Sequence, residues 1–241
     1  LLAVLVLGVG IGANTAIFTV VNQLVFKPLS GQAGDLVGLY SHDRTETNQY
    51  RAFSYANYAD IREQSGVFDH LMAHTFARAG ITSGETTRRT FVQLVSSNYF
   101  ETLGVSLAAG RPFTLEEEQP GARIPVAIVP YARREELGTT IRINARDFTI
   151  VGVAPEGFTG TMALFSAELF LPLGMFDDIV NDLFRDNNLP LSDRANAALI
   201  VAGQLKPALP AAQVEARLEA LSRQLDAAYP GENRDQSARC Q

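Results

Sequence analysis

The apolar and polar positions of this chain divide it into two unequal parts. Residues 1–26 read LLAVLVLGVGIGANTAIFTVVNQLVF and contain no charged side chain, whereas charged residues recur throughout the chain from Lys27 onward. A helix that crosses a bilayer needs about 20 consecutive, mostly apolar residues. The pattern therefore predicts a partial transmembrane helix over residues 1–27, followed by a water-exposed domain over residues 28–241.

Small and polar side chains recur along one stripe of this predicted helix. They are spaced by four, three, four and three residues and are Gly8, Gly12, Thr15, Thr19 and Asn22. This spacing places them on one helical face, where small residues allow another helix to approach closely and to hydrogen-bond. We expect the stripe to be a helix-packing face. A simple anchor with incidental glycines is one alternative, and a cleaved signal peptide is another, although no basic leader precedes the run.

The same glycines also fit a dinucleotide-binding pattern. Gly8, Gly10 and Ala13 match G-x-G-x-x-[GA], residues 36–40 provide a second strand, and Asp43 could bind the ribose. Two features oppose this reading. No charged residue lies between Gly8 and Lys27, although a crossover helix has a solvated face, and the later segments do not alternate strand and helix.

The rest of the chain predicts an α+β domain of short strands and a few helices. Strands are expected over residues 36–40, 68–76, 91–95, 125–129, 140–144, 148–153, 168–171 and 198–202. Ser54 caps a helix that runs to about residue 63, and Ser96 or Ser97 caps a short one over 98–103. Val214, Leu218, Leu221 and Leu225 form the apolar face of a last helix, which packs on its own sheet. Residues 176–195 are polar and predict a solvated loop.

The composition excludes some functions. The chain has 241 residues, a net charge of −6 and one cysteine, Cys240, so it cannot form an intramolecular disulfide. Nucleic-acid binding usually needs a basic patch, and we find only short pairs, Arg88-Arg89 and Arg133-Arg134, which we expect to be solvated. We therefore expect no nucleic-acid partner.

No pattern of catalytic, metal or cofactor-binding residues stands out. His70 and His74 have the spacing of a zinc protease helix, but Leu71, Met72 and Ala73 replace the catalytic glutamate and its neighbours, so a surface or strand pair is expected. Residues 116–118, three consecutive glutamates, lie in a polar run and are expected to be solvated. The sequence contains neither a nucleophile elbow nor a Walker A motif, so we expect no enzyme activity, no cofactor and no metal.

Several strings together resemble the MacB-like, FtsX-like permease family of ABC systems. They are LGVGIGANTAIFTVVNQLVFKPL at 7–29, SYANYADIRE at 54–63, VSSNYFETLGVSLAAGRPFT at 95–114, TIRINARDFTIVGVAPEGFTG at 140–160 and QLKPALPAAQVEARLEAL at 204–221. The order of the five strings is specific and covers nearly the whole chain. The chain departs from the family pattern at 130–136, where PYARREE replaces a longer helical insert, which bears on the packing of the inserted lobe.

The resemblance implies one N-terminal transmembrane helix followed by a two-lobed, mixed α/β periplasmic core domain, one lobe being inserted in the other. It also implies a bacterial inner-membrane protein whose soluble domain lies in the periplasm. The implied partners are membrane lipid, the other transmembrane helices of the same permease, a second copy in a homodimer, a cytoplasmic ABC ATPase and a periplasmic adaptor. The family has no catalytic residues in this domain to carry over.

The expected function is therefore that of a non-catalytic piece of a permease subunit. Because the chain starts with Leu1 inside the apolar run, and because further spans and an ATPase are missing, we expect a longer parent protein. The implied role is to couple ATP hydrolysis to export or to mechanical work in the periplasm. Two alternatives remain, a membrane-anchored binding or sensor domain and a nucleotide-binding oxidoreductase.

Overall fold

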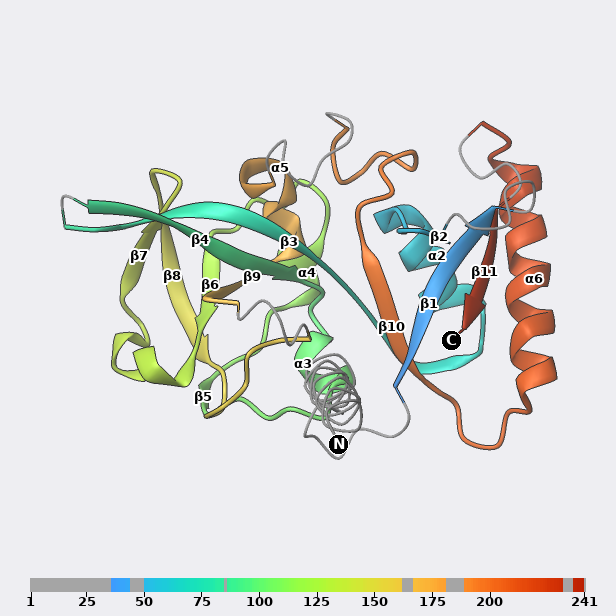
Figure 1. Ribbon diagram of the computed structural model, residues 1–241, viewed down its shortest axis with the longest axis horizontal. Coiled ribbons are helices and arrows are strands. Elements are labelled where there is room, and N and C mark those ends of the chain that lie inside the picture. Colours follow the sequence, from blue (N-terminus) through green and yellow to red (C-terminus); the bar gives the residue numbers. More distant parts are fainter. Residues whose placement is uncertain are drawn as a thin grey trace, which may run out of the picture.

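A computed structural model of the chain describes residues 36–43, 50–84, 86–161, 167–180, 189–231 and 236–240. The predicted transmembrane helix over 1–27 lies outside these residues, and so does its helix-packing face of Gly8, Gly12, Thr15, Thr19 and Asn22. Figure 1 shows two lobes side by side, joined by a long strand that passes from one to the other.

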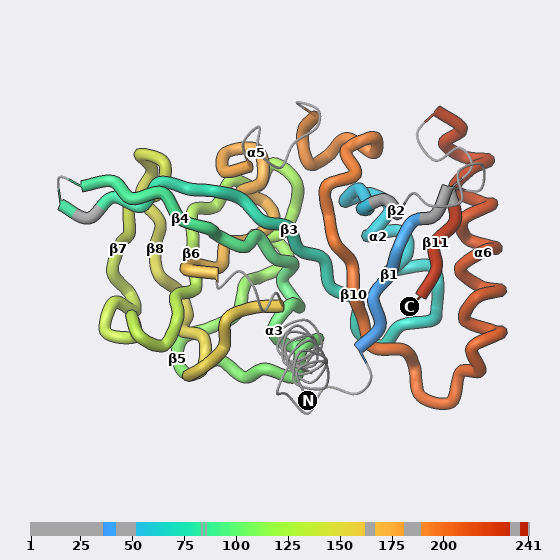
Figure 2. Tube along the Cα trace, viewed as in Figure 1, coloured from blue at the N-terminus to red at the C-terminus, as the bar shows by residue number. Residues whose placement is uncertain are grey.

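The first lobe, here the terminal lobe, is built from both ends of the described chain. It contains β1 (Leu36–Asp43), β2 (Tyr50–Arg51), α2 (Tyr55–Gln64), β10 (Ile200–Leu205), α6 (Ala211–Ala228) and β11 (Gln236–Cys240). β1 lies between β10 and β11, although these strands come from distant parts of the chain (Figure 2). β1 is antiparallel to β10, β11 and β2, which contradicts the dinucleotide fold because that fold needs parallel neighbours.

The second lobe, here the inserted lobe, lies between α2 and β10 in the sequence. Its elements are α3 (Tyr99–Thr102), β5 (Ala109–Gly110), α4 (Leu115–Glu118), β6 (Val126–Val129), the 3-10 helix η1 (Tyr131–Glu136), β7 (Thr140–Ile143), β8 (Arg146–Val153), β9 (Leu169–Pro172), the 3-10 helix η2 (Leu173–Met175) and α5 (Phe176–Ile179). The segment after β6, where the sequence analysis expects a departure from the family pattern, forms η1, and Tyr131 at its start packs against the core.

In the described part of the chain, a single long strand joins the two lobes into one 11-stranded sheet. β3 (Phe68–Ser83) pairs with β10 over its first half and with β4 (Thr86–Val95) over its second half, and His74 takes part in both pairings. β7 pairs with both β3 and β8, so the pairings β3-β4-β9-β6-β8-β7 close into a ring in the inserted lobe. β3 is therefore a continuous element that belongs to both lobes.

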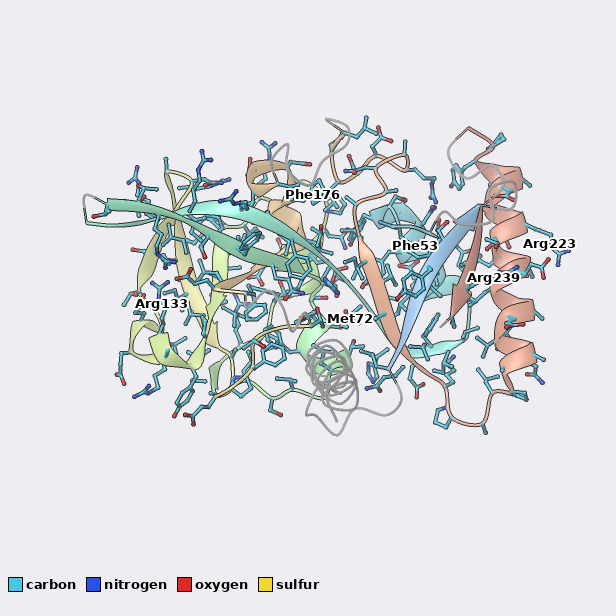
Figure 3. All side chains as sticks on the ribbon, viewed as in Figure 1. Phe53, Met72, Arg133, Phe176, Arg223 and Arg239 are labelled. Carbon is cyan, nitrogen blue, oxygen red and sulfur yellow. The ribbon has the colours of Figure 1, made fainter. Side chains whose placement is uncertain are left out.

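The interior of each lobe is filled by apolar side chains. Figure 3 shows Phe53 and Phe176 pointing inward in the terminal and inserted lobes, whereas Arg223 points outward from α6. Met72 is fully buried between the lobes, in a cluster rich in rings that includes Tyr99, Phe100 and Phe170. As predicted, Val214, Leu218, Leu221 and Leu225 are the buried apolar face of α6.

Within the described residues, the predicted strands and helices are present, but several have different bounds. β3 and β4 are longer than the apolar runs that predicted them, because their outer halves carry polar residues on the solvent side of the ring. Residues 176–179 form α5 rather than the start of a loop. The turn between β7 and β8 comprises only Asn144 and Ala145, both with positive φ.

Candidate functional site at the junction of the two lobes

The terminal lobe presents one face of α2 to the junction. Ser54 starts this helix as predicted, because its hydroxyl oxygen accepts a hydrogen bond from the backbone N–H of Asn57 at 3.2 Å. Tyr55, Tyr58 and Arg62 are spaced by three and four residues, which places them on one face of the helix. This face is directed at the inserted lobe, as the contacts below show.

The inserted lobe contributes the single turn of α4. Thr114 and Glu117 form a capping box, in which the Thr114 hydroxyl accepts from the Glu117 N–H at 3.3 Å and the Glu117 carboxylate accepts from the Thr114 N–H at 2.8 Å. Glu117 also binds Arg111, with nitrogen and oxygen 2.7 Å apart. Burial by itself would raise the pKa of Glu117, but the hydrogen bonds from Arg111 and Thr114 hold it below its ordinary value.

Glu118, the last residue of α4, lies at the centre of the junction and is 0% exposed. One of its carboxylate oxygens accepts from the Tyr55 hydroxyl at 3.1 Å and from the Arg62 guanidinium at 3.0 Å. The other accepts from the backbone N–H of Ser97 at 2.7 Å and from the Ser97 hydroxyl at 2.5 Å. One side chain of the inserted lobe is thereby tied to α2 and to the segment that precedes α3.

Two phenols complete this polar cluster. The Arg62 guanidinium donates to the Tyr58 hydroxyl at 2.9 Å, and that hydroxyl donates to the carbonyl oxygen of Leu71 on β3 at 3.2 Å. Burial raises the pKa of both Tyr55 and Tyr58, and the negative charge of Glu118 adds to this effect. Both phenols therefore stay protonated at neutral pH and act as donors. Because each Glu118 oxygen already accepts two hydrogen bonds, the cluster is suited to holding the lobes together.

A second polar group lies where β3 changes partner. His74 Nε2 is 3.3 Å from the Thr161 hydroxyl, which accepts from the Gln93 amide at 2.9 Å. The Tyr99 hydroxyl is 3.2 Å from the Gln93 side-chain oxygen. Burial lowers the pKa of His74 to about 4, so its imidazole is neutral at physiological pH. This group and the Glu118 cluster both stabilise the region where β3 passes from one lobe to the other.

The histidine pair and the two arginine pairs singled out in the sequence lie at different places in the fold. His70 and His74 lie on β3, as a strand pair, but His74 is buried rather than exposed. Arg88 binds Glu168 through an ion pair on the surface of the inserted lobe, and Arg133 binds Glu136 at 2.6 Å. Within the described ranges, no three potential metal-binding side chains converge.

The prediction that the three glutamates are solvated is wrong for two of them. Glu116 is exposed, but Glu117 and Glu118 are only 4% and 0% exposed. The helical turn of α4 directs them into the junction, where arginine and tyrosine side chains supply hydrogen bonds. The spacing of Thr114 and Glu117 is a capping-box signal that could have predicted α4, but the partners of Glu118 are remote in sequence.

The described part of the chain contains no helix with the length and apolar character of a membrane span.

Two aspartates of the predicted solvated loop form specific contacts. Asp177 accepts a hydrogen bond from the backbone N–H of Leu191 at 2.9 Å, and Asp178 binds Arg146 at 2.7 Å. Asp182 and Asp186 lie outside the described residues.

The two-lobed architecture with an inserted lobe agrees with the fold that the sequence resemblance implies. The model of the MacB-like periplasmic core domain family matches residues 1–221. The chain belongs to this family. It is a MacB-like periplasmic domain of the ABC-type transporter permease family, as the resemblance implied.

Solved structures share the fold of this MacB-like domain. The periplasmic region of MacB from Actinobacillus actinomycetemcomitans matches with a TM-score of 0.56 and 12% identity, covering 87% of this chain and 89% of that one. The extracellular domain of the ABC-type transporter YknZ from Gram-positive bacteria matches with a TM-score of 0.55 and 15% identity, covering 86% of this chain and 100% of that one. A comparison with curated protein sequences finds no match.

Proposed function

We propose that this MacB-like domain transmits mechanical work in a permease and carries out no chemistry of its own. In this proposal residues 1–27 are the first membrane span and residues 28–241 are the periplasmic domain. ATP hydrolysis by a cytoplasmic ABC ATPase is passed through the membrane helices to the two lobes, where it drives export or work on a periplasmic substrate. The family match supports this assignment.

One observation carries the mechanical part of the proposal. β3 runs through both lobes as a single strand, and beside it the buried Glu118 side chain links α4 to α2. Displacements travel through rigid elements and packed side chains. A continuous strand with a polar clamp next to it transmits a displacement from one lobe to the other, whereas a flexible linker would absorb it.

The proposal also includes the partners that the family implies. These are a second copy in a homodimer, the ATPase, membrane lipid, the other transmembrane helices and a periplasmic adaptor. The stripe of Gly8, Gly12, Thr15, Thr19 and Asn22 would then be the face on which the first span packs against other spans. The location would be the bacterial inner membrane, with the two lobes in the periplasm.

A topology experiment tests the placement in the membrane. The 241-residue chain is expressed in a bacterium, membranes are washed with carbonate, and spheroplasts are treated with protease. We expect the chain to stay in the membrane and its domain to be cut from outside. Recovery of the intact chain in the cytoplasmic fraction would refute the proposal.

An assembly experiment tests the packing face and the ATPase partner together. The complete permease is purified from its native membrane, and the dimer yield and the copurifying ATPase activity are measured. Gly12→Leu should reduce both because leucine holds the helices apart, whereas Gly10→Leu, off the stripe, should not. Unchanged yields with Gly12→Leu would exclude this packing face, and absence of any ATPase would favour the sensor alternative.

A further inference from the structure

The chain passes between the two lobes twice, since it enters the inserted lobe along β3 and comes back from α5 to β10. Residues 189–196, here called the return segment, lie between α5 and β10 (Figure 1). Asn196 is 3% exposed, and its side-chain amide donates to the carbonyl oxygens of Leu189 and Pro190, both at 3.0 Å. The return segment is therefore a folded turn held by its own side chain.

One part of the return segment is attached to the inserted lobe. Leu191 is 1% exposed, and its backbone N–H donates to the Asp177 carboxylate of α5 at 2.9 Å. The next residue of α5, Asp178, binds Arg146 of β8 at 2.7 Å. Two neighbouring carboxylates of α5 thus point to different partners, one in the return segment and one in the sheet of the inserted lobe. A displacement of that sheet is passed through α5 to Leu191.

Arg194 attaches the return segment to the terminal lobe. One of its guanidinium nitrogens lies 2.7 Å from an Asp60 carboxylate oxygen and donates to the Asn57 side-chain oxygen at 2.6 Å, both on α2. The guanidinium carbon lies 3.8 Å from the centre of the Tyr229 ring, directly after α6, where the cation is attracted to the ring face. The side chains of Arg194 and Asp60 are only 16% and 20% exposed, so salt screens this ion pair weakly.

The two attachments are close together and hold α2 from two sides. Leu191 and Arg194 are three residues apart, a distance over which an extended backbone spans at most about 10 Å. Asn57 and Asp60 lie on the face of α2 opposite to the one that binds Glu118, because their positions differ by about half a turn from those of the Glu118 partners. The inserted lobe is thereby connected to both faces of α2.

We propose that the return segment is a second rigid connection between the lobes and that Arg194 is the group that closes it. With Arg194 bound, the two lobes are held in one mutual orientation. Its release leaves the lobes joined along β3 and through the Glu118 cluster, and it allows the inserted lobe to rotate about β3 as in a hinge motion. The role of this device in the permease rests on the proposed function, since a transmitted displacement would break the contact between Arg194 and α2.

Distance measurements by double electron–electron resonance on the 241-residue chain in an uncharged detergent test the connection. Cys240→Ser removes the native thiol, and spin labels are attached after Ala216→Cys on α6 and Thr149→Cys on β8, two exposed positions in different lobes. This parent should give one narrow distance distribution. Arg194→Gln should add a second component that is about tenfold more populated than in the parent, because loss of one charge-assisted hydrogen bond shifts an equilibrium by about that factor.

Matched variants separate the connection from a general loss of stability. Arg133 binds Glu136 at 2.6 Å and has a side chain that is 26% exposed, but both residues lie within η1 of the inserted lobe. Arg133→Gln should therefore leave the distance distribution unchanged. Tyr229→Ala removes only the exposed ring that Arg194 contacts, so it should fold even if Arg194→Gln does not, and it should add a smaller second component. Circular dichroism verifies the folding of each variant.

Unchanged distributions in Arg194→Gln and Tyr229→Ala would overturn the proposal, and so would an equal broadening in Arg133→Gln. The same labels in the complete permease, measured with and without ATP, distinguish a failure of this proposal from a failure of the proposed function. If ATP leaves the distance between the lobes unchanged, the mechanical role of the domain is refuted. The comparison of variants without ATP still decides whether Arg194 closes the second connection.

Discussion

Removal of the Glu118 carboxylate should destabilise the protein more than any other change on α4. Glu118 is 0% exposed, and its partner Arg62 has a side chain that is only 23% exposed, so solvent screens the pair weakly. Removing one member of a buried pair costs about 3–5 kcal/mol because the other charge is left unpaired. Arg62 keeps its hydrogen bond to Tyr58, so for Glu118→Ala we expect the lower end, about 3 kcal/mol.

The free energy of unfolding can be measured with urea and far-UV circular dichroism, because the chain contains no tryptophan. A loss of about 3 kcal/mol corresponds to a decrease in melting temperature of roughly 6–12 °C for a domain of this size. Glu116→Ala is the matched control on the same turn. Glu116 is exposed, so its removal should change stability by less than about 0.5 kcal/mol.

A double-mutant cycle isolates the contact between the lobes. Glu118→Ala and Arg62→Met are combined, and the double variant should be more stable than the sum of the single effects predicts, by about 1–3 kcal/mol. The reasoning fails if the two effects are additive, or if Glu118→Ala is no more harmful than Glu116→Ala. Either result would mean that the carboxylate does not clamp α2 to α4.

Two further predictions concern protonation and backbone geometry. Burial lowers the pKa of His74 from 6.5 to about 4. Between these two pH values the unfolded chain therefore binds a proton that the folded chain does not. The free energy of unfolding should fall by up to about 1.4 kcal/mol per pH unit as the pH decreases from 6.5. His74→Asn should abolish this slope in urea titrations at pH 5 to 6.5 and His70→Asn should retain it; an unchanged slope in His74→Asn would contradict the assignment. Gly110→Ala should destabilise strongly, because its Cβ would lie 2.2 Å from the Val151 carbonyl oxygen, whereas Gly121→Ala has a similar positive φ and open space. Equal melting temperatures for the two alanine variants would show that the close approach of β5 and β8 is not restrictive.

Local signals predicted local structure well. Ser54 caps α2, and the spacing of Val214, Leu218 and Leu221 predicted the buried face of α6. Both follow from interactions within one helical turn or along one helical face, so nearby residues contain the necessary information. The strands β7 and β8 were also predicted, but not the tight turn between them, because Ala145 adopts a positive φ (64°) that alanine rarely takes.

The long strands show where the pattern of apolar residues is insufficient. The outer halves of β3 and β4 include Arg78, Arg88 and Arg89, which interrupt the apolar runs. These residues extend the strands because β7 and the rest of the ring supply backbone partners. Pairing between strands is a property of the assembled sheet, so a single strand does not reveal its own length.

The sequence by itself determined the charge-free run at residues 1–26, the family, and the apolar faces of the main helices. Only the tertiary structure decided which polar residues are buried and which partners they bind. Glu118 is buried because Arg62 and Tyr55, which are 56 and 63 residues away, supply its hydrogen bonds. The cost of burying a charge depends on which partners surround it, and folding of the chain selects these partners.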